Sequence, residues 1–324
     1  MKVMSKMEQN QQLYVLGRRV LEMVAQAVIG KEAVILRTFL AILARGHILL
    51  EDIPGVGKTT LALAFSKALC LDYSRMQFNP DVMPSDVTGF SIFDKQSGKM
   101  TYTPGAILCN LFLADELNRA TSRTQSALLE AMEEGQVTVD GISHPLPQPF
   151  IVIATQNPVG AAGTQLLPDS QMDRFMIRLS LGYLNHDSEV VLLKRKQQAN
   201  LLDLVTPVLD HRGLEQMCNE VDRIHVHPDL YEYIVALVGA TRNHPDILLG
   251  ASPRASLALV SLSKALAYLH GRDYITPNDI TSLFIDAVAH RIILRAGTGK
   301  ERNAAEAILS DIVRAVRAPQ MTRR

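Results

Sequence analysis

The residues best suited to chemistry stand together at positions 52–60, which are Asp-Ile-Pro-Gly-Val-Gly-Lys-Thr-Thr. An apolar segment precedes them and a helix predicted for residues 60–69 follows, the setting of a phosphate-binding loop. Glycines let backbone amides approach phosphate oxygens, and a helix N-terminus adds the positive end of a dipole. A lysine here can reach the β- and γ-phosphates, while Thr59 offers a hydroxyl to Mg²⁺. We predict that ATP is bound by Pro54, Gly55, Val56, Gly57, Lys58, Thr59 and Thr60.

This loop departs from the usual pattern at its first position, where Asp52 replaces glycine. Because the closest phosphate contacts come from the later residues of the loop, we interpret the segment as a variant of the same site. A second Gly-x-Gly-Lys occurs at residues 297–300, but Glu301 follows it and a helix precedes it. That copy is predicted to be a loop between helices.

Two carboxylates, Asp115 and Glu116, follow the apolar run at residues 111–114. Open α/β sheets bind ligands at the carboxyl ends of their strands. There Asp115 can hold Mg²⁺, and Glu116 can orient and deprotonate the attacking water. Asn157 follows the next apolar run and can bond either the γ-phosphate or that water. The alternative interpretation is that Asn157 belongs to an ordinary Asn-Pro turn and has no role in the site.

The elements that must position these residues change in kind along the chain. Short apolar runs alternate with helical patterns in the first half, as in an α/β layer fold. We predict strands at residues 47–51, 73–78, 110–114, 150–154 and 175–179. Past about Tyr183 only helices are predicted, at residues 187–200, 213–222, 228–243, 253–270 and 277–294. Residues 1–184 are therefore expected to form an α/β nucleotide-binding core, and residues 185–324 a separate all-helical domain.

Composition limits the function classes. The chain has 324 residues, 47% hydrophobic, with 33 basic and 33 acidic side chains. Zero net charge argues against bulk attraction to nucleic acid or to an anionic membrane. The three cysteines have neither disulfide nor zinc-site spacing. The most apolar stretch, residues 33–50, is broken by Arg37, Arg45 and His47, and its longest apolar run, residues 39–44, is far below the roughly 20 residues of a membrane span, so we expect a cytoplasmic protein.

Five segments together resemble the MoxR family of AAA+ ATPases: residues 52–59, 113–121, 127–132, 154–158 and 171–175. The resemblance implies a P-loop core whose five parallel strands lie in the order 5-1-4-3-2, followed by a smaller all-helical lid. It also implies a homo-oligomeric ring, expected to be a hexamer, with ATP at the subunit interfaces. Implied partners are a protein with a von Willebrand factor A-like domain and a client protein.

The resemblance further implies roles for single residues. Arg174 matches an arginine finger that reaches the γ-phosphate of a neighbouring subunit, although the residues alone would favour a surface ion pair. Arg254, in Ser-Pro-Arg-Ala, matches the lid arginine called sensor 2, which faces the nucleotide of its own subunit. Gly30, with Val28 and Ile29, matches an apolar turn that packs against adenine.

Two β-hairpins are predicted, at residues 88–103 within the second helix and at residues 136–147 with Asp140-Gly141 at the tip. They resemble insertions of the AAA+ branch that contains magnesium chelatase motors. Two interpretations stay open, contact with substrate and bracing of the ring. Arg119 and Arg123 likewise either face a neighbouring subunit or mark a solvated helix start.

The function indicated is an ATP-hydrolysing, chaperone-like ring motor that matures, remodels or inserts a cofactor into a partner protein. One alternative is the motor subunit of a metal-chelatase-like complex. A nucleic-acid translocase is disfavoured because residues 139–144 contain no Lys or Arg, and Lys95 and Lys99 are the only basic residues of the other hairpin. A nucleotide switch without hydrolysis is disfavoured by Glu116.

Overall fold

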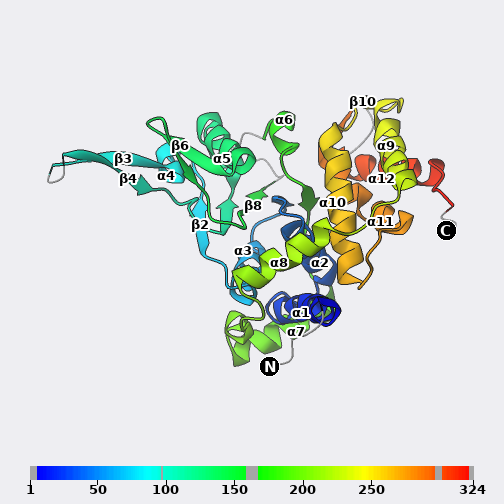
Figure 1. The fold of residues 1–324 in the computed structure, drawn as a ribbon, viewed down its shortest axis with the longest axis horizontal. Coiled ribbons are helices and arrows are strands. Elements are labelled where there is room, and N and C mark those ends of the chain that lie inside the picture. The colour runs from blue at the N-terminus through cyan, green and yellow to red at the C-terminus, as the bar shows by residue number, and fades with distance from the viewer. Residues whose placement is uncertain (1–5, 96–97, 158–166, 296–300, 321–324) are drawn as a thin grey trace.

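A five-stranded parallel sheet forms the centre of the molecule (Figure 1). The computed structural model describes residues 6–95, 98–157, 167–295 and 301–320. The sheet strands are β1 (Ile48–Glu51), β2 (Tyr73–Gln77), β5 (Leu111–Asp115), β8 (Ile151–Gln156) and β9 (Ile177–Leu179). Their order is β2-β5-β8-β1-β9. When only these five strands are numbered along the chain, and the sheet is followed from the β9 edge to the β2 edge, the order is 5-1-4-3-2, as predicted.

Helices cover both faces of this sheet, which is why its central strands are continuous apolar runs. One face packs against α1 (Lys6–Ala27), α2 (Glu32–Leu43) and α3 (Lys58–Ala68). The other face packs against α5 (Ser122–Glu134), which follows the short 3₁₀ helix η1 (Leu117–Arg119). All six residues of β8 are buried. The polar residues of the site therefore stand at the strand ends.

Both predicted hairpins are present. The first consists of β3 (Gly89–Asp94) and β4 (Lys99–Pro104), and it extends away from the body of the molecule (Figure 1). It follows the short helix α4 (Pro84–Thr88), and among residues 105–110 no helix resumes, so its placement within a helix was wrong. The second consists of β6 (Gln136–Val139) and β7 (Ile142–Pro145). The rings of Tyr102 and His144 stack with centroids 3.7 Å apart, which joins the two hairpins.

The second half of the chain is mainly helical, as predicted. After α6 (Asp169–Met172) and β9 come α7 (His186–Gln198), η2 (Leu201–Leu204), α8 (His211–Asp222), α9 (Pro228–Arg242), α10 (Pro253–Leu269), α11 (Pro277–Val288), η3 (Ala289–Arg291) and α12 (Glu301–Ala315). Three of these begin with proline in the first turn, where its missing N–H costs nothing.

The helix predicted for residues 277–294 was too long. It ends at Val288, and the 3₁₀ turn η3 then buries His290 and Arg291. The chain continues into β11 (Ile293–Leu294), which pairs with β10 (Ile247–Leu249) in a small antiparallel sheet. This half therefore contains strands that its sequence pattern did not predict. The second Gly-x-Gly-Lys, residues 297–300, lies outside the described residues.

One apolar core runs through both halves of the chain. It contains Phe39 of α2 together with Met217 of α8 and Leu269 of α10, all buried. At Gly17 of α1 the approach is close, since a Cβ there would lie 2.8 Å from Leu269 Cδ2 and 2.9 Å from Met217 Cε. The boundary predicted after residue 184 thus does not coincide with a gap in the core. Across the residues described, no helix combines the length and apolar character needed to span a bilayer.

Candidate nucleotide-hydrolysis site

The phosphate loop joins β1 to α3, with Gly55 and Gly57 in the left-handed region at φ values of 87° and 102°. A side chain at either position would strain the backbone. The Lys58 ammonium donates to the carbonyls of Asp52, 2.7 Å away, and Ile53, 3.3 Å away. Burial lowers the pKa of Lys58, and the carboxylates of Asp52, Asp115 and Glu116 act in the opposite direction. The amine is therefore held inside the loop and close to the acidic pair.

A cavity of about 460 Å³ opens beside this loop. Its lining includes the loop residues Pro54, Gly55, Val56, Gly57 and Thr60, and the apolar residues Val28 and Ile29 from the turn between α1 and α2. Gly30, in that turn, has a φ of 67°, and a Cβ there would collide with Ser188 of α7. The structure thus brings the predicted adenine turn and the phosphate loop around one cavity.

Asp52 has a structural role that explains its place in the loop. Its buried carboxylate accepts hydrogen bonds from the Ser180 hydroxyl at 2.9 Å and from the backbone amides of Leu181 and Gly182. These residues follow β9 and lead into the lid, and Gly182 itself lines the cavity. The acidic side chain therefore faces backbone N–H groups and ties the phosphate loop to the segment that enters the lid.

The acidic pair is organised by Thr155, which sequence reasoning missed. The buried Thr155 hydroxyl donates to Asp115 Oδ1 at 2.7 Å and accepts from the Glu116 backbone N–H at 2.8 Å. Arg75 of β2 donates to the other oxygen of Asp115, also at 2.7 Å. These contacts join residues on neighbouring strands, which are far apart in the sequence. They could therefore have been found only by knowing which strands are paired in the sheet.

Glu116 stands just beyond β5 with a left-handed φ of 57°, an uncommon backbone for a glutamate. Its carboxylate forms an ion pair with Arg119 of the same chain, N to O 2.8 Å. This contact within one chain is neither of the two alternatives predicted for Arg119. Arg123 is exposed at the start of α5.

Oxygen donors for a cation are present at this strand edge. Thr59 lies in the first turn of α3, and Asp115 ends β5. Mg²⁺ is usually held by one or two such groups together with waters and phosphate oxygens rather than by a complete protein cage. The residues described contain no cluster of three or more His, Cys, Asp or Glu suited to a metal. Asn157 follows β8 directly, and its backbone carbonyl lies 3.5 Å from the Asn118 side-chain amide.

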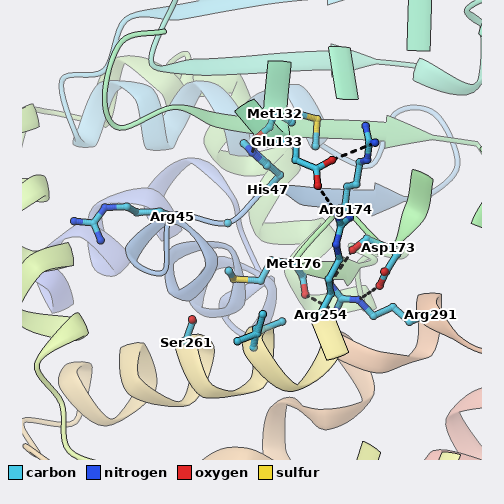
Figure 2. Close-up of a pocket in the computed structure, with 13 residues that line it drawn as sticks. Arg45, His47, Met132, Glu133, Asp173, Arg174, Met176, Arg254, Ser261 and Arg291 are labelled. Carbon is cyan, nitrogen blue, oxygen red and sulfur yellow. Dashed lines mark hydrogen bonds and ion pairs between the residues drawn. The ribbon is translucent and has the colours of Figure 1, made fainter. Parts of the chain in front are cut away.

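Arg174 and Arg254 lie together in a different place (Figure 2). Both form ion pairs with Glu133 of α5, Arg174 at 3.1 Å and Arg254 at the other carboxylate oxygen. They line a second cavity of about 310 Å³, whose lining includes none of residues 52–60. The arginine expected to face the nucleotide of its own subunit is therefore beside the expected finger and away from its own phosphate loop.

A P-loop between the first strand and helix of a 5-1-4-3-2 sheet, with an acidic pair ending the third, is the arrangement of an AAA+ ATPase. The comparisons agree. Residues 47–177 match the model of the ATPase family associated with various cellular activities, and residues 239–312 match the AAA lid domain. The chain is an ATPase.

Relatives identify the family. The chain is 42% identical to the uncharacterized protein YeaC of Bacillus subtilis, covering 97% of this chain and 98% of YeaC. It is 33% identical to the chaperone MoxR1 of Mycobacterium tuberculosis, covering 96% and 84%. A crystal structure of a candidate ATPase from Cytophaga hutchinsonii superposes with a TM-score of 0.89 at 36% identity, covering 97% and 98%. The chain belongs to the MoxR family of AAA+ ATPases.

Proposed function

We propose that this chaperone-like ATPase works as a ring, expected to be a hexamer, in which each nucleotide is completed by the next subunit. The observation that carries this proposal is the common position of Arg174 and Arg254 at a cavity separate from their own phosphate loop. Two guanidinium groups beside each other suit a polyphosphate brought by another molecule. A second copy of this chain would bring such a polyphosphate, namely the ATP bound in its own phosphate-loop cavity.

Each subunit contributes the remaining chemistry. The phosphate-loop amides and Lys58 bind the triphosphate, and the turn at Gly30 contacts adenine. Thr59 and Asp115 would hold Mg²⁺, which when bound offsets phosphate charge.

Glu116 takes the proton of the attacking water once the ion pair with Arg119 opens, and Asn157 orients that water or the γ-phosphate. Arg174 of one subunit then stabilises charge at the nucleotide of its neighbour.

The exposed side chains of the first hairpin support the hypothesis that the substrate is another protein. Phe90, Ile92, Phe93 and Met100 are exposed on it by 45–58% of their surface. Because side chains alternate along a strand, Phe90 and Ile92 lie on one face of the hairpin, and Phe93 lies on the other face beside its partner Met100. Exposed large apolar side chains on a projecting element suit contact with another protein. We propose that these two faces contact the protein being matured or remodelled in the cytoplasm. A partner with a von Willebrand factor A-like domain remains part of the proposal.

Mixing two inactive variants tests the shared site. Arg174→Ala subunits keep their own Lys58 and Glu116 but offer no finger, whereas Glu116→Gln subunits offer a finger but lack the base. A finger that acts across an interface is worth about 10³–10⁵ in rate, so each variant alone should be nearly inactive. In mixed rings, some interfaces pair an intact Glu116 with an intact Arg174, and ATP turnover should partly return.

Mass measurement or light scattering must show that the mixed assemblies form. Mixed rings that stay inactive at every ratio would contradict a finger acting between subunits, provided that wild-type subunits diluted with Glu116→Gln subunits retain turnover. A chain that stays monomeric with ATP and hydrolyses it at full rate would contradict the ring itself.

A further inference from the structure

We propose that Arg291 is a positioning residue that holds Arg174 and Arg254 in the geometry required by the neighbouring nucleotide. This inference rests on the proposed function, because it assigns the support of the same shared site. Arg291 belongs to η3, far along the chain from both arginines, and it lines the cavity that they line (Figure 2).

The Arg291 guanidinium is buried, with 3% of its side chain exposed, and the bonds described for it are to residues 173–176 and to Ala287 of α11. Its Nε donates to Asp173 Oδ1 at 2.8 Å. One terminal nitrogen donates to the carbonyls of Asp173 at 3.2 Å and Phe175 at 2.7 Å. The other donates to the carbonyls of Met176, 3.2 Å away, and Ala287. The backbone on both sides of Arg174 is thus fixed by one side chain.

The same contacts extend to Arg254. Asp173 Oδ2 accepts from the Ser252 hydroxyl at 2.8 Å, and Ser252 is the N-cap of α10. The Ser252 oxygen accepts from the backbone N–H of Arg254 at 3.1 Å. Asp173 therefore connects the turn that carries Arg174 with the helix start that carries Arg254, and Arg291 holds Asp173 in place.

Burying a charged guanidinium is costly, and an apolar residue of similar volume often stabilises a protein as well or better. Burial lowers the pKa of Arg291, and the nearby Arg254 acts in the same direction, while Asp173 opposes both. What arginine adds is a rigid planar fork that bonds several carbonyls at once. That property fixes position, and a displacement of about 1 Å at a catalytic group can reduce rate about 10²-fold.

The variant to make is Arg291→Lys, which keeps the charge and loses the fork. We expect nucleotide affinity, measured with a fluorescent ATP analogue, to change less than about twofold, because the phosphate loop and Lys58 stay intact in every subunit and line or adjoin a cavity that Arg291 does not line. Turnover should fall roughly 10- to 100-fold. A matched control is Arg272→Lys, since Arg272 forms a comparable two-bond pair with Asp279 elsewhere in the lid. That variant should retain turnover.

Mixing separates positioning from general damage. Arg291→Lys subunits should regain activity when mixed with Glu116→Gln subunits, whose fingers are intact, and should gain none above their own reduced rate when mixed with Arg174→Ala subunits. Recovery with Arg174→Ala would overturn the proposal, because it would place the defect in the variant's own site. Wild-type turnover in Arg291→Lys, or a loss equal to that of the Arg272 control, would also overturn it.

Should Arg291→Lys fail to fold, Ser252→Ala removes the link from Asp173 toward Arg254, together with the N-cap side chain of α10, and should show the same mixing pattern with a smaller loss, about tenfold. Full turnover in Ser252→Ala would then count against the proposal. The pair Arg174→Ala and Glu116→Gln serves as the reference. If that pair fails to recover, the shared site itself fails, and this is distinguishable from failure of Arg291 alone.

Discussion

At Thr155 a single hydroxyl bonds both acidic residues of the site, so its removal should disturb both at once. Thr155→Val keeps the shape of the side chain but leaves the Glu116 N–H and one Asp115 oxygen without their partner. Unpaired buried polar groups cost about 1–3 kcal/mol each, and misplaced catalytic groups cost about 10²-fold in rate. We expect a lower melting temperature and a kcat reduced by about that factor.

Thr155→Ser is the matched control, because it retains the hydroxyl and loses one methyl group. It should recover most of the turnover lost in Thr155→Val. If the serine and valine variants lose turnover equally, the hydroxyl is not what organises the acidic pair.

His47 gives the fold a dependence on acid. Its ring is partly buried, with Nε2 3.1 Å from the Met132 carbonyl and Nδ1 accepting from the Val152 N–H at 3.0 Å. This pairing requires the neutral ring, and burial lowers the pKa of His47 to about 4. Between pH 6.5 and 4 the unfolded chain binds the extra proton, so stability falls as the pH falls through this range. Over the whole range the loss is about 3 kcal/mol.

Urea unfolding at pH 7.5, 6 and 5 measures this effect. His47→Gln cannot take up the proton, so its free energy of unfolding should depend less steeply on pH than that of the wild type. Equal slopes would show that His47 is not a source of the acid sensitivity. Part of the slope will remain in the variant, because burial also lowers the pKa of His290.

Some residues of the site could be predicted and others could not. Lys58, Asp115 and Glu116 stand at fixed distances from turns and strand ends, so sequence spacing identifies them. Thr155, Glu133 and Arg291 act on partners that lie on other elements, and only the packing of those elements brings them together. Their residue types alone carry no signal, since a buried threonine and a surface glutamate are common everywhere.

At the scale of elements, the sheet strands and both hairpins were predictable because apolar runs and turn residues are local signals. The end of α11 was not. Residues 289–294 continue an apolar pattern that suits a helix, yet tertiary contacts of His290 and Arg291 with Phe175 end it. Local propensity was overruled by burial of two polar side chains.

The hairpins also allow a test against nucleic acid. The first hairpin exposes four large apolar side chains, the second (residues 136–145) contains no Lys or Arg, and the chain has no net charge to attract phosphate. Single- or double-stranded DNA should therefore leave the ATPase rate unchanged at about 0.15 M salt, where surface charges are screened beyond about 8 Å. The measurement is steady-state turnover with and without DNA. Stimulation of several-fold at that salt concentration would instead favour a translocase.

At the scale of the whole molecule, the continuous core predicts that both halves unfold together. Met217 lies in the helical half and packs into the cluster that contains α1 and α2. Met217→Ala should cost about 2–5 kcal/mol by leaving a cavity. We expect one calorimetric transition in the wild type and one, at lower temperature, in the variant. Two separate transitions, with only one shifted by the substitution, would show that the lid folds independently.

The single core also determines which parts of the molecule are free to move. A lid that shares its apolar interior with α1 and α2 cannot swing open without exposing that interior to water, so it behaves as part of the frame. The second cluster is smaller and contains α5 together with the base of the hairpins. We therefore expect any movement driven by ATP to occur on that side, in the projecting hairpins, while the lid and α1–α3 stay fixed relative to one another.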